Sequence, residues 1–421
     1  MRNHGASSIY VLLSSVSSLC YSMIFTIELI YQARIVGLDP LQLMFVGSVQ
    51  QSVNFLFQAP TGILADIYSR RWAIVLGFLL AGTGYLLEGF VPTFVAVLAA
   101  AGIEGLGATL VSGADAAWIA DEMGAERVGQ VYIRAAQIGS ITSLLGIALS
   151  AVLINIHLNL PIIVGGCLFI VLAIVLALIM PEQYFKPIIR EDRNTFQQMR
   201  RMLGTSIQLI RLRPVLLTIL GIGAFYGMFT AGFDRLWPYH LLHNFTFPPL
   251  GGLTSLVWFC IIEAGIVITN WIGIEIIRRR VDTNSHHAVA WAMFIVDALL
   301  IICVIGFALA GQFALALAAF WLFTTAAGPR APLEQAWMNQ NLDSSVRATV
   351  LSLRGQVSAI AQIVGGPLLG MIATVFTTQI ALITAGIILS PALLFYARTV
   401  RHNKPLTAPI ESEATSPVQP R

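Results

Sequence analysis

Long apolar segments alternate with short polar connections along almost the whole chain. Runs of about 20 apolar residues, the length that crosses the hydrocarbon core of a bilayer as an α-helix, recur about twelve times. This pattern predicts an all-α, polytopic membrane protein with about twelve transmembrane helices. The predicted spans are 9–31, 43–64, 72–90, 93–118, 132–154, 162–180, 215–239, 253–274, 289–310, 313–325 continuing toward 337, 349–376 and 380–396.

The longest polar stretch in the interior, residues 181–213, separates the first six spans from the last six. We therefore expect an N-terminal six-helix bundle at 1–180 and a C-terminal six-helix bundle at 214–398. The stretch between them is basic and partly apolar, which fits an amphipathic segment on the inner leaflet or a solvated cytoplasmic linker. Residues 399–421 have too little apolar content to fold alone, so we expect a disordered cytoplasmic tail.

An internal repeat relates the two halves. Asp115 stands three residues before Trp118 in the fourth span, and Glu334 stands three residues before Trp337 in the tenth. Repeats of this kind build many secondary transporters, whose substrate site lies between the repeats. We therefore expect two pseudo-symmetric bundles. The arginines that follow are seven residues apart in both copies, Arg127 with Arg134 and Arg347 with Arg354.

Composition and charge agree with a bilayer location. The chain is 57% hydrophobic and only 11% charged, so it lacks the polar surface that a soluble protein of 421 residues needs. If the N-terminus is cytoplasmic, nearly all Lys and Arg residues lie at cytoplasmic ends of spans, and only Arg34 and Arg235 lie at outer ends. We expect a multi-pass protein of the cell membrane with both termini cytoplasmic. The net charge of +3 then gives no reason to expect a nucleic-acid partner.

No enzyme motif or metal motif stands out. The sequence has no nucleotide-binding loop of the form G-x-x-x-x-G-K-[ST] and no H-E-x-x-H pair, so we expect neither ATP-driven transport nor enzymatic activity. We expect no cofactor and no metal site. The cysteines lie in predicted spans, too scattered for metal binding and badly placed for an extracellular disulfide framework, at Cys20, Cys167, Cys260 and Cys303.

A polar turn between the second and third spans contains Gly62, Asp66, Arg70 and Arg71. It resembles the loop between helices 2 and 3 of the major facilitator superfamily, whose pattern is G-x-L-a-D-r-x-G-r-k, although Ile67 and Ser69 depart from that pattern. The resemblance extends from about position 9 to 398. The stretch Gly-Ala-Asp-Ala-Ala-Trp-Ile-Ala-Asp-Glu in the fourth span is similar to bacterial efflux-type permeases of that superfamily.

The resemblance implies a secondary active transporter that works by alternating access. Helices 1, 4, 7 and 10 of the family line a central cavity, and helices 3, 6, 9 and 12 form an outer scaffold. We expect proton-coupled export of small amphipathic, drug-like compounds by a monomer whose partners are its small-molecule substrate, protons and the lipid bilayer. The fifth span lacks the proline of the family's antiporter motif. A proton-coupled importer of a small nutrient and a non-transporting membrane receptor or assembly factor remain as alternatives.

Acidic residues inside the spans are the strongest guide to a transport site, because ionisable groups within a bilayer are costly. Glu104 lies about eleven residues, or roughly 17 Å, into the fourth span. It is either a protonatable coupling site, a counter-charge for a cationic substrate, or a permanently protonated group bonded to a neighbouring helix. Glu28 in the first span and Glu263 in the eighth are further candidates for proton coupling or for the substrate cavity, with structural hydrogen bonding as the alternative.

The repeat also predicts paired charges near the cytoplasmic mouth. Asp115 and Arg134 lie at equal distances from the turn after the fourth span, and Glu334 and Arg354 have the same relation in the second half. Antiparallel helices would bring each acid and its arginine to one depth, where they can pair. We predict two such ion pairs, which act either as an inner gate that breaks during transport or as permanent staples.

Two further charge clusters are expected at the ends of the spans. By resemblance, Asp66, Arg70 or Arg71, and Asp121 form a cluster that locks the cytoplasmic side of family members. Asp234 and Arg235, near the outer end of the seventh span, are interpreted as a self-satisfied pair at an extracellular gate. Asp297 in the ninth span has no explanation, since that helix should belong to the scaffold.

Overall fold

The computed structural model describes residues 3–124, 126–185, 214–341 and 344–402. Within these ranges the chain is helical, with one isolated β-bridge between Leu250 and Leu253, which confirms the all-α prediction. Most of the predicted linker and tail lies outside the described residues. The helices are α1 (Asn3–Phe25), α2 (Glu28–Arg34), α3 (Pro40–Ile67), α4 (Arg70–Phe90), α5 (Phe94–Val111), α6 (Ala114–Met123), α7 (Val128–Leu153), α8 (Leu160–Ile179), α10 (Pro214–Asn244), α11 (Val257–Arg280), α12 (His286–Leu309), α13 (Phe313–Ala327), α14 (Arg330–Asn341), α15 (Ser344–Val375) and α16 (Thr378–His402).

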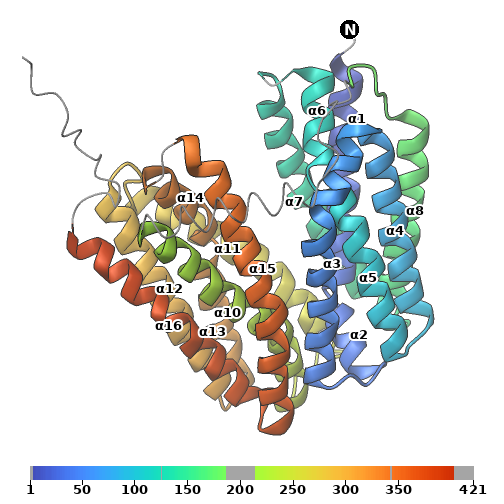
Figure 1. Cartoon of the computed structure of the whole chain (residues 1–421). Helices are drawn as coiled ribbons and strands as arrows, with labels where there is room; N and C mark the ends of the chain where they lie inside the picture. Colours follow the sequence, from blue (N-terminus) through green and yellow to red (C-terminus); the bar gives the residue numbers. More distant parts are fainter. Residues whose placement is uncertain (1–2, 125, 186–213, 342–343, 403–421) are drawn as a thin grey trace, which may run out of the picture.

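The helices form two bundles, α1 to α8 and α10 to α16 (Figure 1). The bundles lie against each other at the end of the molecule where α2 lies, which we call the joined end. They diverge toward the opposite end, where α3 passes into α4 and where α6 and α14 lie; we call this the diverging end. The arrangement supports the predicted division of the spans into six and six.

Three predicted spans are interrupted helices. The first span breaks between Phe25 and Glu28, and the fourth breaks at Ser112 and Gly113. Gly113 has a φ of 81°, a left-handed conformation that glycine adopts without steric strain. The tenth span breaks at Gly328 and Pro329, between α13 and α14. Both halves therefore interrupt their fourth helix near the diverging end, which the sequence analysis did not predict.

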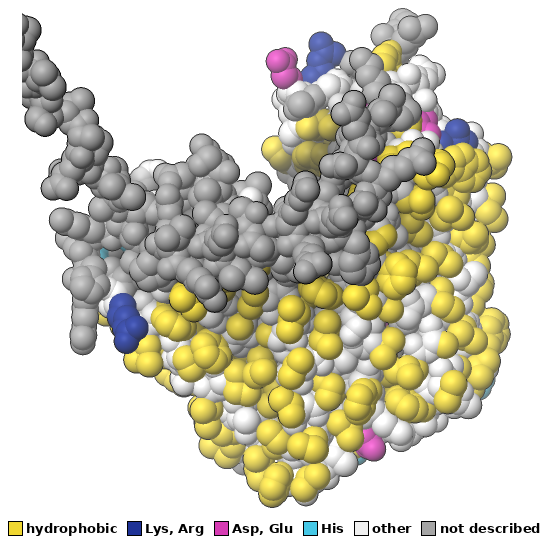
Figure 2. Space-filling view, viewed as in Figure 1, with side chains coloured by type: hydrophobic (Ala, Val, Ile, Leu, Met, Phe, Trp, Pro, Cys, Tyr) yellow, Lys and Arg dark blue, Asp and Glu magenta, His cyan; other side chains and the backbone are white. Residues whose placement is uncertain are grey.

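Eleven segments of the described chain are long and apolar enough to cross a membrane. The twelfth membrane-length helix is α3, which has 28 residues but carries polar side chains such as Gln50, Gln51 and Asn54 along its middle. The prediction of about twelve spans is thereby confirmed. Hydrophobic side chains cover much of the described surface of both bundles in the view of Figure 2, where charged side chains are sparse.

The N-terminal bundle is packed through small residues. A Cβ atom on Gly77 of α4 would lie 2.7 Å from the carbonyl oxygen of Gly107 in α5, and one on Gly82 would lie 2.7 Å from that of Gly166 in α8. Such contacts let helix backbones approach closely, as small residues do in membrane proteins. Helix α4 is therefore held tightly between α5 and α8.

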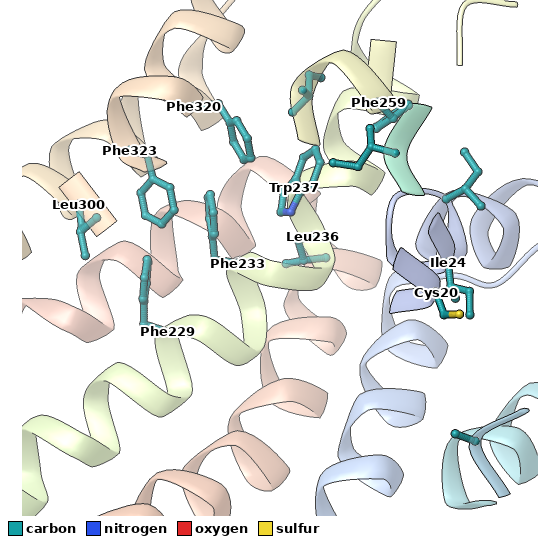
Figure 3. Packing of buried hydrophobic residues seen from close by; sticks show 14 of the residues in the cluster. Cys20, Ile24, Phe229, Phe233, Leu236, Trp237, Phe259, Leu300, Phe320 and Phe323 are labelled. Atoms are coloured by element: carbon teal, nitrogen blue, oxygen red, sulfur yellow. The ribbon is translucent and has the colours of Figure 1, made fainter. Parts of the chain in front are cut away.

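The C-terminal bundle is packed through aromatic rings instead. The rings of Phe233 and Phe323 lie 4.2 Å apart, and Phe229, Phe320 and Trp237 surround them (Figure 3). All five side chains are buried. Phe229 and Phe233 therefore belong to the core of this bundle.

The two bundles contact each other mainly through α3 and α15. Gly370 of α15 lies against Leu41 and Met44 of α3, and the backbone N–H of Leu41 donates to Thr374 Oγ1 at 3.1 Å. A second contact joins Asn155, just beyond α7, to the backbone N–H of Thr254 at 3.0 Å. These contacts close the joined end.

Candidate functional site

A cavity of about 420 Å³ lies between the two bundles, just inside the joined end. Its wall is made by α1, α2 and α3 of the N-terminal bundle and by α10, α11 and α15 of the C-terminal bundle. The volume is within the range of small-molecule sites, and transporters built from repeats bind their substrates in this position. The cavity is therefore the candidate substrate site.

Both bundles contribute carboxyl groups to the cavity wall. Glu28 comes from α2, Asp234 from α10 and Glu263 from α11. The structure thus places Glu28 and Glu263, two of the three acids predicted for the cavity, on its wall. The third, Glu104, lies behind the wall rather than on it. The cavity therefore combines acids from both bundles, and the distances between these acids would change if the bundles moved relative to each other.

The remainder of the wall is partly polar and partly apolar. Amide side chains come from Gln50 and Gln51 of α3 and from Gln362 of α15. Phe25 and Trp237 supply aromatic surface. Such a wall suits a ligand that has one apolar part and one polar or charged part.

Behind Glu28, three carboxyl groups converge in the N-terminal bundle. One oxygen from each of Glu28, Glu88 and Glu104 lies within 4.8 Å of the other two. Glu88 and Glu104 are 1% and 4% exposed, so their side chains are almost completely enclosed. We call Glu28, Glu88, Glu104 and the adjacent Gln32 the acid cluster. It joins α2, α4 and α5 behind the cavity wall.

Gln32 organises the acid cluster. Its Nε2 donates to Glu88 Oε1 at 2.9 Å and to Glu28 Oε1 at 3.3 Å. The hydroxyl group of Tyr31 donates to the backbone carbonyl of Glu88 at 2.9 Å, which fixes α2 against α4. Glu104 approaches α4 at Gly84, where an added Cβ atom would lie 2.7 Å from Glu104 Cγ. The absence of a side chain at Gly84 leaves the room that Glu104 occupies.

The sequence analysis did not single out Glu88. An acidic residue in the third span was a visible signal, by the same reasoning that selected Glu104. The family resemblance places the third helix in the outer scaffold, where an acid that points toward the cavity is not expected. The structure shows that α4 presents Glu88 inward, toward α2 and α5.

Arg235 faces the cavity but does not pair with Asp234. Its Nη2 donates to Gln50 Oε1 of the opposite bundle at 3.2 Å. The side chain passes directly over Gly47 of α3, where a Cβ atom would clash with it. The predicted self-satisfied pair of Asp234 and Arg235 is therefore wrong, because adjacent residues on a helix point in different directions. Both residues line the cavity, and Arg235 links the two bundles.

At the diverging end, the predicted charge cluster is present within the N-terminal bundle. Arg70 forms ion pairs with Asp66, at 3.1 Å, and with Asp121, and it donates to the carbonyl of Ala117 at 3.1 Å. These contacts tie α3, α4 and α6 together. Arg71 does not share in the ion pairs of Arg70, since its guanidinium donates to the carbonyl of Ala177 in α8.

The same corner is closed by residues that the sequence analysis left unassigned. Glu182, which follows α8, accepts from the hydroxyl of Ser69 at 2.6 Å and from the backbone N–H of Arg71 at 3.1 Å. Gly62 lies one turn before Asp66 on α3, and no described atom lies within 4 Å of its would-be Cβ. Gly62 therefore presents bare backbone where the bundles diverge.

The C-terminal bundle holds a buried charge network at its diverging end. Glu334 and Arg354 form the predicted ion pair. Arg330 joins them, because its Nη1 donates to Glu334 Oε2 at 3.1 Å and its Nε donates to Asp297 Oδ1 at 2.9 Å. Its guanidinium also lies 3.3 Å from the centre of the Tyr226 ring. Asp297 is thus explained: it is the counter-charge of Arg330, a residue that the sequence analysis missed.

The matching pair in the N-terminal bundle is absent. Asp115 and Arg134 form no ion pair with each other in the described chain, so that prediction is wrong. The prediction assumed one continuous fourth helix, whereas Asp115 lies in the first turn of the separate helix α6. The partial positive charge of a helix N-terminus favours a carboxylate there without an arginine. Arg134 is exposed on α7.

Comparisons with known proteins agree on the family. The family model described as Major Facilitator Superfamily matches residues 10–313. The uncharacterized MFS-type transporter YxaM of Bacillus subtilis (strain 168) is 21% identical over 360 residues, which cover 85% of this chain and 87% of that protein.

Solved structures show the same fold at low sequence identity. The crystal structure of the nucleoside transporter NupG has a TM-score of 0.76 and 14% identity, with 94% of this chain and 98% of that chain covered. A bacterial homolog of the human lysosomal transporter Spinster, in an inward-facing and unoccupied conformation, has a TM-score of 0.71 and 13% identity, with 96% and 98% covered.

Proposed function

Because the chain belongs to the major facilitator superfamily, we propose that it is a secondary active transporter that binds a small molecule in the cavity between its bundles and releases it by alternating access. The bundles would rock about the α3 and α15 contact, so that the joined end opens as the diverging end closes. The observation that carries the proposal is the cavity wall, to which both bundles contribute carboxyl groups.

The coupling step follows from charge balance. A carboxylate in a site of low dielectric constant is costly without a compensating positive charge. Either a proton or the cationic group of a substrate can supply that charge, but one carboxyl group does not accept both at once. Glu28 and Glu263 face the cavity from opposite bundles, and Glu104 lies behind Glu28. We infer that they exchange a proton for a cationic substrate.

The substrate that fits this wall is a small amphipathic cation. Phe25 and Trp237 offer apolar contact to one part of it, while Glu28, Asp234 and Glu263 attract the charged part. Proton entry driven by the membrane gradient would expel such a compound, so we propose export. The similarity of the fourth span to efflux-type permeases supports the same direction.

The charge clusters at the diverging end fit the role of an inner gate. Arg70 with Asp66 and Asp121 holds the corner of the N-terminal bundle, and Glu334 with Arg354 holds the corresponding end of the other bundle. We propose that this end is cytoplasmic, as the distribution of basic residues predicts. The charge clusters of the two bundles would approach each other when the joined end opens and the diverging end closes.

A transport assay in proteoliposomes tests the proposal. The protein is reconstituted with an imposed pH gradient, and movement of ethidium, an aromatic cation, is followed together with proton flux. We expect ethidium flux against its gradient in the wild type, and loss of coupled proton flux in Glu104→Gln and Glu263→Gln. Glu275→Gln is the matched control, because Glu275 is a surface partner of Arg278 and Arg279. Coupled proton flux that persists in both Glu104→Gln and Glu263→Gln would contradict the assignment of these acids.

Import of a small polar nutrient is a second candidate. The three glutamine amides of the wall, Gln50, Gln51 and Gln362, favour it because amides donate to and accept from a neutral polar ligand. In the same liposomes, a symporter would accumulate its substrate on the side that protons enter. An exporter would accumulate it on the opposite side, so the direction of accumulation separates the two functions.

A further inference from the structure

The acid cluster contains more acceptor oxygens than donors. Among the described residues, Gln32 Nε2 is the side-chain donor that reaches Glu28 and Glu88, and no hydrogen bond to Glu104 is present. Glu104 Oε1 is buried without a hydrogen-bond partner. A buried carboxyl oxygen in this state is costly unless the group carries a proton or meets a positively charged ligand.

Gln32 gives independent evidence for such a ligand. Its side chain is 0% exposed and its amide is inserted between Glu28 and Glu88. Its Nε2 is satisfied by the two carboxyl groups, but its Oε1 is buried without a partner. An unpartnered amide oxygen, on a buried side chain inserted between two of the carboxyl groups, is a typical oxygen ligand for a hard cation.

The spacing of the oxygens fits one small metal ion. A hard cation such as Ca²⁺ binds oxygen at about 2.3–2.6 Å, so two of its ligands lie at most about 5 Å apart. One carboxyl oxygen from each of Glu28, Glu88 and Glu104 lies within 4.8 Å of the other two. Na⁺ has nearly the radius of Ca²⁺, whereas K⁺ is larger and needs longer distances. The first span is interrupted between Phe25 and Glu28, and interrupted helices line ion sites in other secondary transporters.

We propose that Glu28, Gln32, Glu88 and Glu104 form a Na⁺ site in the N-terminal bundle. The inference deepens the proposed function and rests on it, since a bound Na⁺ would compete with the coupling proton for the same carboxyl groups behind the substrate cavity. A monovalent ion is favoured over a divalent one because three carboxylates would hold a doubly charged ion more tightly, and an ion that must be released in every cycle has to bind weakly enough to leave.

Thermal unfolding of the purified full-length protein tests the site directly. The melting temperature is measured without substrate, at one pH and one chloride concentration, in NaCl, LiCl, KCl, choline chloride, MgCl₂ and CaCl₂. We expect NaCl to raise Tm by at least about 2 °C relative to choline chloride once Na⁺ is at about 100 times its Kd. Equal Tm values in Na⁺, K⁺ and choline, or stabilisation by the divalent ions alone, would overturn the proposal.

Variants locate the ion within the protein. Glu88→Gln removes a ligand that does not line the cavity, and we expect it to weaken Na⁺ affinity by more than about tenfold. Glu263→Gln is the matched control, because Glu263 is a cavity acid outside the cluster, and it should keep the Na⁺ response. A Glu88→Gln protein that retains the full response would contradict the assignment. If that variant fails to fold, direct binding of ²²Na⁺ to the wild type, displaced by LiCl but not by choline chloride, decides the matter.

The two proposals can fail separately. If Na⁺ has no effect on stability or on ²²Na⁺ binding but ethidium flux follows the pH gradient, the sodium site is wrong and the proposed function stands. If ²²Na⁺ binds but no gradient drives ethidium, the site stands and the proposed function is wrong.

Discussion

The two bundles share a helix order but place their buried charges at opposite levels. In the N-terminal bundle, Glu88 and Glu104 lie behind the central cavity. In the C-terminal bundle, Asp297, Arg330 and Glu334 lie at the diverging end, and the level of the cavity is filled by aromatic rings. Among the described residues, only the N-terminal bundle therefore has enclosed acids without counter-charges behind the cavity, whereas Asp234 and Glu263 of the other bundle line the cavity itself.

Aligning the two halves by their internal repeat shows the same difference at individual positions. The register that matches Asp115 with Glu334 and Trp118 with Trp337 also matches Glu88 with Phe307 and Glu104 with Phe323. Phe307 and Phe323 both pack against Phe233 in the aromatic core. Conversely, Arg330 corresponds to Val111, which packs beside Gly77. The halves therefore keep one scaffold but fill equivalent positions differently, with acids in one bundle and aromatic rings in the other.

The largest expected effect comes from breaking the charge network of the C-terminal bundle. Arg330→Ala leaves Asp297, which is 0% exposed, without its guanidinium partner, and leaves Glu334, which is 6% exposed, with Arg354 alone. Removing one partner of a buried ion pair costs about 3–5 kcal/mol. We expect the free energy of unfolding in detergent to fall by that amount, or the protein not to accumulate. Arg278→Ala, at an exposed ion pair, should leave stability unchanged. A stable Arg330→Ala protein would show that the network is dispensable.

A smaller loss of stability should distinguish Arg354 from Arg134, the arginine at the corresponding position of the other repeat. Arg354→Ala removes a charged hydrogen bond to Glu334, so we expect a loss of about 1.5–3 kcal/mol. Arg134→Ala removes an exposed side chain without an ion pair, and we expect a change within about 0.5 kcal/mol. Denaturant unfolding of the two variants measures the difference. Equal losses of stability would indicate that Arg134 has an ion pair equivalent to that of Arg354, which would contradict the structure.

The fit of Glu104 against α4 can be tested with one methyl group. Gly84→Ala places a Cβ atom 2.7 Å from Glu104 Cγ and 3.2 Å from the carbonyl oxygen of Ala100. Overpacking of this kind costs about 1–3 kcal/mol, and it should also abolish the Tm response to Na⁺. Gly102→Ala on α5 meets no described atom within 4 Å and is the control. If both variants kept the wild-type melting curve and Na⁺ response, Glu104 would not be packed as described.

Much of the fold could be predicted from the sequence. The lengths of the apolar segments predicted the membrane spans, and the polar stretch after the sixth span predicted where the two bundles divide. Local motifs also predicted contacts correctly where the partners are close in sequence or held by a short turn, as for Asp66 with Arg70 and for Glu334 with Arg354.

The rest depends on how helices rotate against each other. Asp297 and Arg330 are on different helices, and so are Glu28, Glu88 and Glu104. A sequence gives the depth of such residues in the membrane but not the direction in which they point. The helix breaks were also missed, because Gly113 and Gly328 are small residues of a kind that uninterrupted membrane helices contain as well.

The polar middle of α3 has a consequence for biogenesis. Gln50 and Gln51 serve the cavity, yet they make α3 the membrane-length helix that falls short of the hydropathy of the other eleven segments. A helix of that composition partitions poorly from the translocon into lipid when it is alone. It is followed at once by the strongly apolar α4, so the two would enter the membrane together as a hairpin. The side chains that line the cavity of the finished protein would thus make α3 leave the translocon together with α4 rather than alone.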